Sequence, residues 1–146
     1  MKRSIAKVEP ARAGKKRERW QKIAEAAAMQ SRRDFIPEVR EPLSFAEALR
    51  EAAKADHLLI PYELEDGQAS TYKAVSSIRP GETVAFFIGP EGGIEEAEVR
   101  AVEEAGGKAI SLGRRILRTE TAGLCFLSWL VWQLEFAQGE EKQETI

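Results

Sequence analysis

Two loops constrain the fold most, because each joins an apolar run to a helix-like run. The first, GPEGG at residues 89–93, follows the apolar run 84–88, and the second, SLGRRILRTETA at 111–122, follows 108–110. Right-handed crossovers return successive strand–loop–helix units to one edge of a parallel sheet, and open α/β sheets bind ligands at that edge. The sequence therefore predicts an α/β fold with a mostly parallel sheet and flanking helices, in which both loops share one site.

The rest of the chain continues this alternation, and 146 residues suit one domain, so we predict a single domain over residues 1–146. Residues 1–14 lack periodicity and predict an irregular start, and the polar residues 138–146 predict a flexible tail. The predicted helices are 15–31, one that starts at Ser44, 70–78, 94–105 and 118–136, and the predicted strands are 38–40, 57–62, 83–88 and 108–112.

The net charge of −2 conceals an asymmetry along the chain. Residues 1–40 carry 12 Lys and Arg against 5 Asp and Glu, whereas residues 41–146 carry 10 against 19. A basic amino-terminal arm on an acidic body indicates a face that meets phosphate, although a solvated basic helix gives the same composition.

Composition also bears on the cellular compartment. The single cysteine, Cys125, excludes an intrachain disulfide framework and fits a reducing cytosol. Residues 1–40 do not read as a signal peptide, and the longest apolar stretch, 122–134, is too short to span a bilayer. We therefore expect a cytoplasmic protein with no membrane partner.

The last predicted helix is apolar on two sides. One stripe is Leu124, Leu127, Val131 and Leu134, and the other is Cys125, Trp129, Trp132 and Phe136. The sheet can cover one stripe, so the second needs another partner. We expect a homodimer through Trp129, Trp132 and Phe136; a further helix of the same subunit is the alternative.

The loops carry side chains suited to acid–base and anion chemistry. Glu91 is the one side chain of GPEGG that can take a proton, and Arg118 and Glu120 open the last helix beside the second loop. There is no GxxxxGK[ST] phosphate loop and no GxGxxG motif after a strand. The lone His57 has no Cys or His neighbours at ligand spacing, so no metal site is predicted.

Three blocks of the sequence resemble a known family. GPEGG, SLGRRILRTETA and the stretch KKRERWQKIAEAAAMQSRRDFIPEV at 15–39 are similar to the bacterial 16S rRNA (uracil-N3)-methyltransferases of the SPOUT superfamily. The resemblance implies a deep trefoil knot near the C-terminus, S-adenosylmethionine bound in the knot, and a homodimer. It also implies methylation of N3 of a uridine in 16S rRNA of the small ribosomal subunit.

The chain departs from the family pattern in three ways. Family members carry a PUA-like RNA-binding barrel and then a first strand and helix, and this chain begins after both. Met29 stands where the family usually has Glu, and Arg32 stands where it usually has Gly. A SPOUT enzyme with another RNA target, or an inactive dimerising or binding remnant, therefore stays open as an alternative.

The resemblance and the loop chemistry together assign candidate roles. The predicted cofactor-binding residues are Pro61, Gly89, Gly92, Gly93, Leu112, Gly113, Ile116 and Leu117. The predicted RNA-binding residues are Lys15, Lys16, Arg17, Arg19, Gln30 and Arg33. The predicted catalytic residues are Arg118, which holds the negative uracil oxygens or a phosphate, and Glu120 or Glu91, one of which acts as base or orients Arg118.

Overall fold

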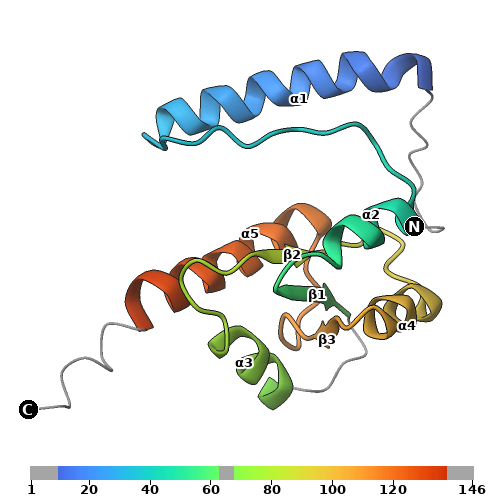
Figure 1. The fold of residues 1–146 in the computed structure, drawn as a ribbon, viewed down its shortest axis with the longest axis vertical. Coiled ribbons are helices and arrows are strands. Elements are labelled where there is room, and N and C mark those ends of the chain that lie inside the picture. Colours follow the sequence, from blue (N-terminus) through green and yellow to red (C-terminus); the bar gives the residue numbers. More distant parts are fainter. Residues whose placement is uncertain (1–9, 63–67, 138–146) are drawn as a thin grey trace, which may run out of the picture. The chain divides into compact units, whose positions relative to one another are not determined.

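A computed structural model describes residues 10–62 and 68–137 (Figure 1). Its contacts divide the chain into two compact units, one of them Ala6–Ser44 and the other containing Phe45–Ile146. The helices are α1 (Pro10–Gln30), α2 (Phe45–Ala52), α3 (Gln68–Ser76), α4 (Glu96–Glu104) and α5 (Thr119–Val131), which a π-helical turn (Trp132–Phe136) continues. The strands are β1 (His57–Pro61), β2 (Val84–Phe86) and β3 (Lys108–Ile110).

The second unit is built on a parallel sheet of order β2-β1-β3. His57 pairs with Val84 on one side of β1, and Leu59 pairs with Lys108 on the other. The three middle residues of β1 are all buried, as expected for a central parallel strand covered on both faces. The predicted α/β class with a parallel sheet and flanking helices is confirmed.

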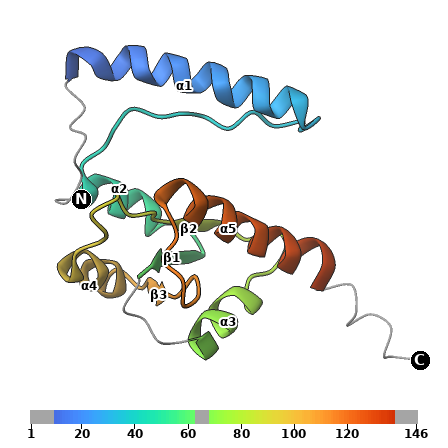
Figure 2. The same ribbon diagram turned by 180° about the vertical axis from the view of Figure 1, so that it is seen from behind.

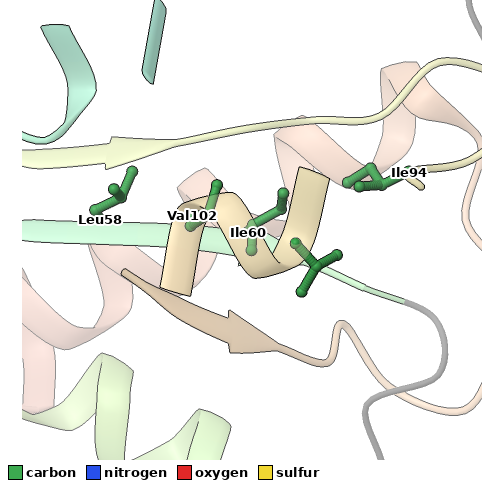
Figure 3. Close-up of a cluster of buried hydrophobic side chains, with 5 residues drawn as sticks. Leu58, Ile60, Ile94 and Val102 are labelled. Carbon is green, nitrogen blue, oxygen red and sulfur yellow. The ribbon is translucent and has the colours of Figure 1, made fainter. Parts of the chain in front are cut away.

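One face of the sheet packs against α2 and α4. Leu58 and Ile60 of β1 contact Ile94 and the α4 residues Val99 and Val102 (Figure 3). Phe45, Leu49 and Ala52 of α2 complete this cluster. The alternation of β1 side chains thus directs Leu58 and Ile60 to the same core.

The other face packs against α3 and α5, and Figure 2 shows these elements from behind. Leu59 meets Ala74, Ile78, Ile110 and Phe126, and the rings of Phe86 and Phe126 lie 4.5 Å apart. Trp129 and Leu134 also pack against this cluster. The predicted pair of stripes on the last helix is therefore wrong in its membership, because Trp129 of one stripe and Leu134 of the other both pack against this cluster.

The first unit consists of α1 and the segment 31–44. The Gln21 side chain donates to the carbonyl oxygen of Pro37 at 3.3 Å and accepts from the amide of Val39 at 2.7 Å. The predicted strand at 38–40 is wrong, because this segment bonds to a side chain of α1 and not to a neighbouring strand. The helix begins at Pro10 and not at residue 15, since proline is tolerated in a first turn.

The end of α1 has an unusual backbone conformation at Arg32. Arg32 has a φ of 53°, and the amide of Arg33 donates to the carbonyl oxygen of Ala28 at 3.0 Å. This left-handed conformation at a helix end favours glycine. Arg32 adopts this geometry with a full side chain.

The amino ends of β1 and β2 are joined by side chains. The Asp56 carboxylate accepts bonds from the amide and hydroxyl of Thr83 at 2.8 and 2.7 Å, and these bonds lower its pKa. Glu82 accepts a bond from the amide of Arg79 at 2.7 Å, which lowers its pKa, and pairs with His57 at 2.7 Å. These groups join β1 and β2 at their amino ends, opposite to the edge of the sheet where the loops 89–93 and 111–122 begin.

No helix within the described residues is both long enough and apolar enough to cross a membrane. The predicted tail at 138–146 and most of the predicted irregular start lie outside the described residues.

Candidate functional site

A cleft of about 690 Å³ opens at the carboxyl ends of the three strands. Every strand contributes to it through the residues at its end or in the loop that follows, and α4 and α5 add residues from their first turns. The lining residues are Pro61, Tyr62, Ile88, Gly89, Pro90, Glu91, Gly92, Gly93, Ile94, Glu96, Ser111, Leu112, Gly113, Arg115, Ile116, Leu117, Thr119 and Ala122. The volume lies in the range of small-molecule sites.

The first loop is a tight turn between β2 and α4. The amide of Gly93 donates to the carbonyl oxygen of Pro90 at 2.8 Å, and Gly93 has a φ of 77°. A Cβ atom at Gly89 would lie 2.7 Å from a side-chain carbon of Ile94, so any larger residue there would have to displace Ile94. The whole turn, with its three glycines, Pro90 and Glu91, lines the wall of the cleft.

The second loop leaves the sheet at a defined point. The amide of Tyr62 donates to the carbonyl oxygen of Ile110 at 2.9 Å, and the next amide, that of Ser111, donates to the Thr71 hydroxyl at 2.8 Å. Gly113 has a φ of 103°, and its amide donates to the Ser111 hydroxyl at 3.2 Å. The Thr119 hydroxyl donates to the carbonyl oxygen of Gly89 at 3.0 Å, which joins the two loops.

The structure brings all eight predicted cofactor-binding residues into this one cleft, together with Glu91. Arg118 and Glu120 are exposed and do not line the cleft. The carbonyl oxygen of Arg118 accepts from the amides of Thr121 and Ala122 at 2.9 and 2.8 Å, so its main chain is fixed as the cap of α5. The catalytic and binding roles of these residues stay predictions.

Sequence reasoning missed several residues that line the cleft. Arg115 lies inside the SLGRRILR motif, and Tyr62 ends the predicted strand 57–62. Both positions are therefore ones at which the sequence could have indicated a site residue. Glu96 is the first residue of α4 and pairs with Arg100. The cleft therefore presents two carboxylates, Glu91 and Glu96, and one guanidinium, Arg115.

The predicted RNA-binding residues lie in the first unit. Arg17 is paired with Glu41 at 2.8 Å, on the side of α1 that holds segment 31–44 through Gln21. Lys15 and Arg19, spaced four residues apart, lie on the opposite side of the helix and are exposed, as are Lys16, Gln30 and Arg33. The exposed side of α1 is thus basic, whereas Arg17 is occupied within its own unit.

A parallel α/β sheet with a ligand-sized cleft at the carboxyl ends of its strands defines an α/β ligand-binding domain. A family model described as an RNA methyltransferase domain matches residues 1–131. The chain therefore belongs to this RNA methyltransferase family, and the resemblance drawn from the loop motifs is confirmed.

Similar proteins include curated relatives and solved structures. Ribosomal RNA small subunit methyltransferase E of Bacillus subtilis is 42% identical over 142 residues, which are 95% of this chain and 56% of the relative. The protein of the same name from Mesomycoplasma hyopneumoniae is 35% identical over 118 residues, which are 78% of this chain and 48% of the relative. The chain spans about half the length of the curated relatives it matches.

Two solved structures carry a bound cofactor. A ribosomal RNA small subunit methyltransferase E from Neisseria gonorrhoeae bound to S-adenosylmethionine has a TM-score of 0.69 and 35% identity, over 90% of this chain and 51% of that one. A putative methyltransferase from Legionella pneumophila in complex with the same cofactor has a TM-score of 0.79 and 34% identity, over 92% of this chain and 53% of that one.

Proposed function

We propose that this chain forms the catalytic domain of an S-adenosylmethionine-dependent methyltransferase that acts on N3 of a uridine in 16S rRNA. The observation that carries the proposal is the single cleft lined by both loops, in a chain of the RNA methyltransferase family. The relatives named as small-subunit rRNA methyltransferases favour this target over another RNA. An intact cleft favours an enzyme over an inactive remnant.

The residues of the cleft fit S-adenosylmethionine. This cofactor supplies, when bound, an electrophilic methyl group on a positively charged sulfonium, and it also carries an ammonium and a carboxylate. Glu91 and Glu96 suit its positive groups, and Arg115 suits its carboxylate. The main chain of Leu112 and Ile116 can hold the edge of the adenine ring without a charged partner.

Transfer to N3 needs the removal of a proton, because the N3 of neutral uridine carries one. Glu91 lines the cleft and is exposed, so it is the first candidate to take that proton. Glu120, in the first turn of α5, is the second candidate, or it orients Arg118. Arg118 lies between Leu117 and Thr119, which both line the cleft, and would stabilise the negative charge that develops on the uracil oxygens.

The same proposal includes a single SPOUT domain over residues 1–146 with a deep trefoil knot near the C-terminus. Membership of the RNA methyltransferase family supports it, and the bond from Thr119 to Gly89 joins the start of α5 to the first loop. A crystal structure of the chain with S-adenosylmethionine, traced through 84–136, tests the knot directly.

We expect methyl transfer to assembled small ribosomal subunits by the unmodified chain. The measurement is incorporation of a labelled methyl group, with the modified base identified as N3-methyluridine by mass spectrometry. Labelling at another atom or in another RNA would contradict the stated target. Binding of S-adenosylmethionine without any transfer would favour the inactive remnant.

The exposed basic side of α1 is proposed to contact RNA. Replacing Lys15, Lys16 and Arg19 together by glutamine should weaken RNA binding and lower the salt dependence of the binding constant by about 2 to 3 in log–log slope. RNA-binding titrations at salt concentrations from about 50 to about 200 mM measure this slope, because phosphate contacts weaken strongly over that range. Arg17→Gln is the control, because Arg17 already pairs with Glu41; an equal loss in the control would refute the assignment.

Homodimerisation is proposed through the exposed apolar residues of α5 and the turn that follows. Leu124, Leu127 and Val131 are exposed, Trp132 and Phe136 are 64% and 57% exposed, and the last two rings stack at 5.5 Å. Trp132→Glu should give a monomer or an aggregate, since an unpaired charge in an apolar interface is costly. Light scattering that finds the unmodified chain monomeric at micromolar concentration would contradict the dimer.

A further inference from the structure

The second loop is held by threonine hydroxyls at both of its ends. At its start, the Thr71 hydroxyl of α3 accepts a hydrogen bond from the amide of Ser111 at 2.8 Å. At its end, the Thr119 hydroxyl donates to the carbonyl oxygen of Gly89 at 3.0 Å. Thr119 lines the cleft, whereas Thr71 does not.

The amide of Ser111 forms its bond just beyond the last hydrogen bond between β3 and β1. β3 is an edge strand in the order β2-β1-β3, and its last bond toward β1 is the one that the carbonyl oxygen of Ile110 accepts from Tyr62. The Ser111 amide points to α3 instead, where Thr71 is only 6% exposed. A buried amide that has no hydrogen-bond partner destabilises the conformation in which it occurs. The Thr71 hydroxyl therefore favours the conformation in which the chain turns toward α3 after Ile110.

The constraint continues into the cleft through one more hydrogen bond of Ser111. The Ser111 hydroxyl accepts from the amide of Gly113 at 3.2 Å, and Gly113 holds a φ of 103°. Ser111, Leu112 and Gly113 all line the cleft. Thr71 is thus connected to the main chain that faces the ligand, although its own side chain lies outside the cleft.

We propose that Thr71 is a positioning residue that pre-organises the cofactor-binding loop, with Thr119 fixing the opposite end of the same loop. This inference rests on the proposed function, because it takes S-adenosylmethionine as the ligand of the cleft. A loop already held in its bound conformation binds more tightly, since less ordering remains to be done on binding. Thr71 therefore affects cofactor affinity and not the chemical step.

The test compares Thr71→Val, which keeps the shape and removes the hydroxyl, with Thr71→Ser, which keeps the hydroxyl. Calorimetry with S-adenosylmethionine should give a Kd about tenfold higher for Thr71→Val, equivalent to about 1.4 kcal/mol. Thr71→Ser should restore the Kd to within about threefold of the unmodified chain, on the same scale. At saturating cofactor, kcat of Thr71→Val should stay near that of the unmodified chain.

A matched control removes a threonine hydroxyl at the other end of the sheet. Thr83 donates to Asp56 and has no contact with the cleft, so Thr83→Val should lower stability without changing the Kd. An unchanged Kd in Thr71→Val, or an equal rise in Thr71→Val and Thr83→Val, would overturn the proposal. So would a fall in kcat with an unchanged KM for the cofactor.

Two further measurements decide the matter if Thr71→Val does not fold. Amide hydrogen exchange of the unmodified, ligand-free chain should show Ser111 and Gly113 protected, and Thr119→Val should raise the Kd for the cofactor. Rapid exchange at Ser111 would overturn the inference even in a chain that binds cofactor well. If the unmodified chain binds no S-adenosylmethionine, the proposed function fails, whereas slow exchange at Ser111 would still show the tether.

Discussion

Replacing Gly113 by valine is expected to raise the Kd for S-adenosylmethionine by roughly a hundredfold or more, equivalent to about 2.7 kcal/mol. Gly113 has a φ of 103°, a conformation that a β-branched residue adopts only with strain of about 1–3 kcal/mol. The loop can relieve this strain only by moving main chain that lines the cleft. A Cβ at this position meets no protein atom within 4 Å, so the expected damage comes from the backbone conformation and not from a clash within the protein.

The matched control is Gly81→Val, since Gly81 has a φ of 90° and its Cβ would also meet nothing within 4 Å. Gly81 lies before β2, away from the cleft, so this variant should lose stability but keep its affinity for the cofactor. Calorimetry on both variants separates backbone strain from damage to the site. Unchanged affinity in Gly113→Val would remove the second loop from the cofactor site.

The position of the cleft could be predicted from the sequence because it depends on local signals and one topological rule. Apolar runs before GPEGG and SLG mark strands, and successive parallel strands place their carboxyl ends on one edge. The eight predicted cofactor residues follow from those two facts and from the family motif, and they line one cleft. Arg115 lies in the same motif, but the motif alone does not distinguish it from Arg114 and Arg118, which do not line the cleft.

The errors come from contacts between segments far apart in the sequence. The segment 38–40 has the composition of a strand, but Val39 bonds to Gln21, a partner 18 positions earlier that no local pattern indicates. Helical periodicity identified α5 as apolar on two sides, yet it could not say which side meets the sheet. Packing of Phe126 against Phe86 decides that, and it turns Trp129 inward and Trp132 outward.

The Thr71 hydroxyl shows the same limit at the site itself. Thr71 and Ser111 are 40 positions apart, and a threonine in a short helix has many ordinary roles. Only the structure connects it to the loop, because the connection depends on where the edge strand ends. Residues that hold a site are therefore harder to find from sequence than residues that line it.

Replacing Arg118 by alanine is expected to lower kcat for methyl transfer well over tenfold, equivalent to about 1.4 kcal/mol or more of transition-state stabilisation. The main chain of Arg118 caps α5 through the amides of Thr121 and Ala122, and these bonds do not depend on its side chain. The variant should therefore keep the loop and the Kd for S-adenosylmethionine nearly intact. Loss of rate with retained cofactor binding is the result expected for a group that stabilises charge on the uracil.

Arg114→Ala provides the matched control for this variant. Arg114 is an exposed arginine of the same loop that does not line the cleft, so its removal changes the local charge equally and should leave kcat near that of the unmodified chain. Arg118→Lys keeps the charge but loses the planar fork that pairs with two oxygens, and an intermediate rate would indicate that geometry matters beyond charge. A raised KM for the cofactor with kcat untouched in Arg118→Ala would instead assign this arginine to the cofactor, and Glu91, Glu96 and Arg115 would then be the charged groups of the cleft from which the uridine's partners must come.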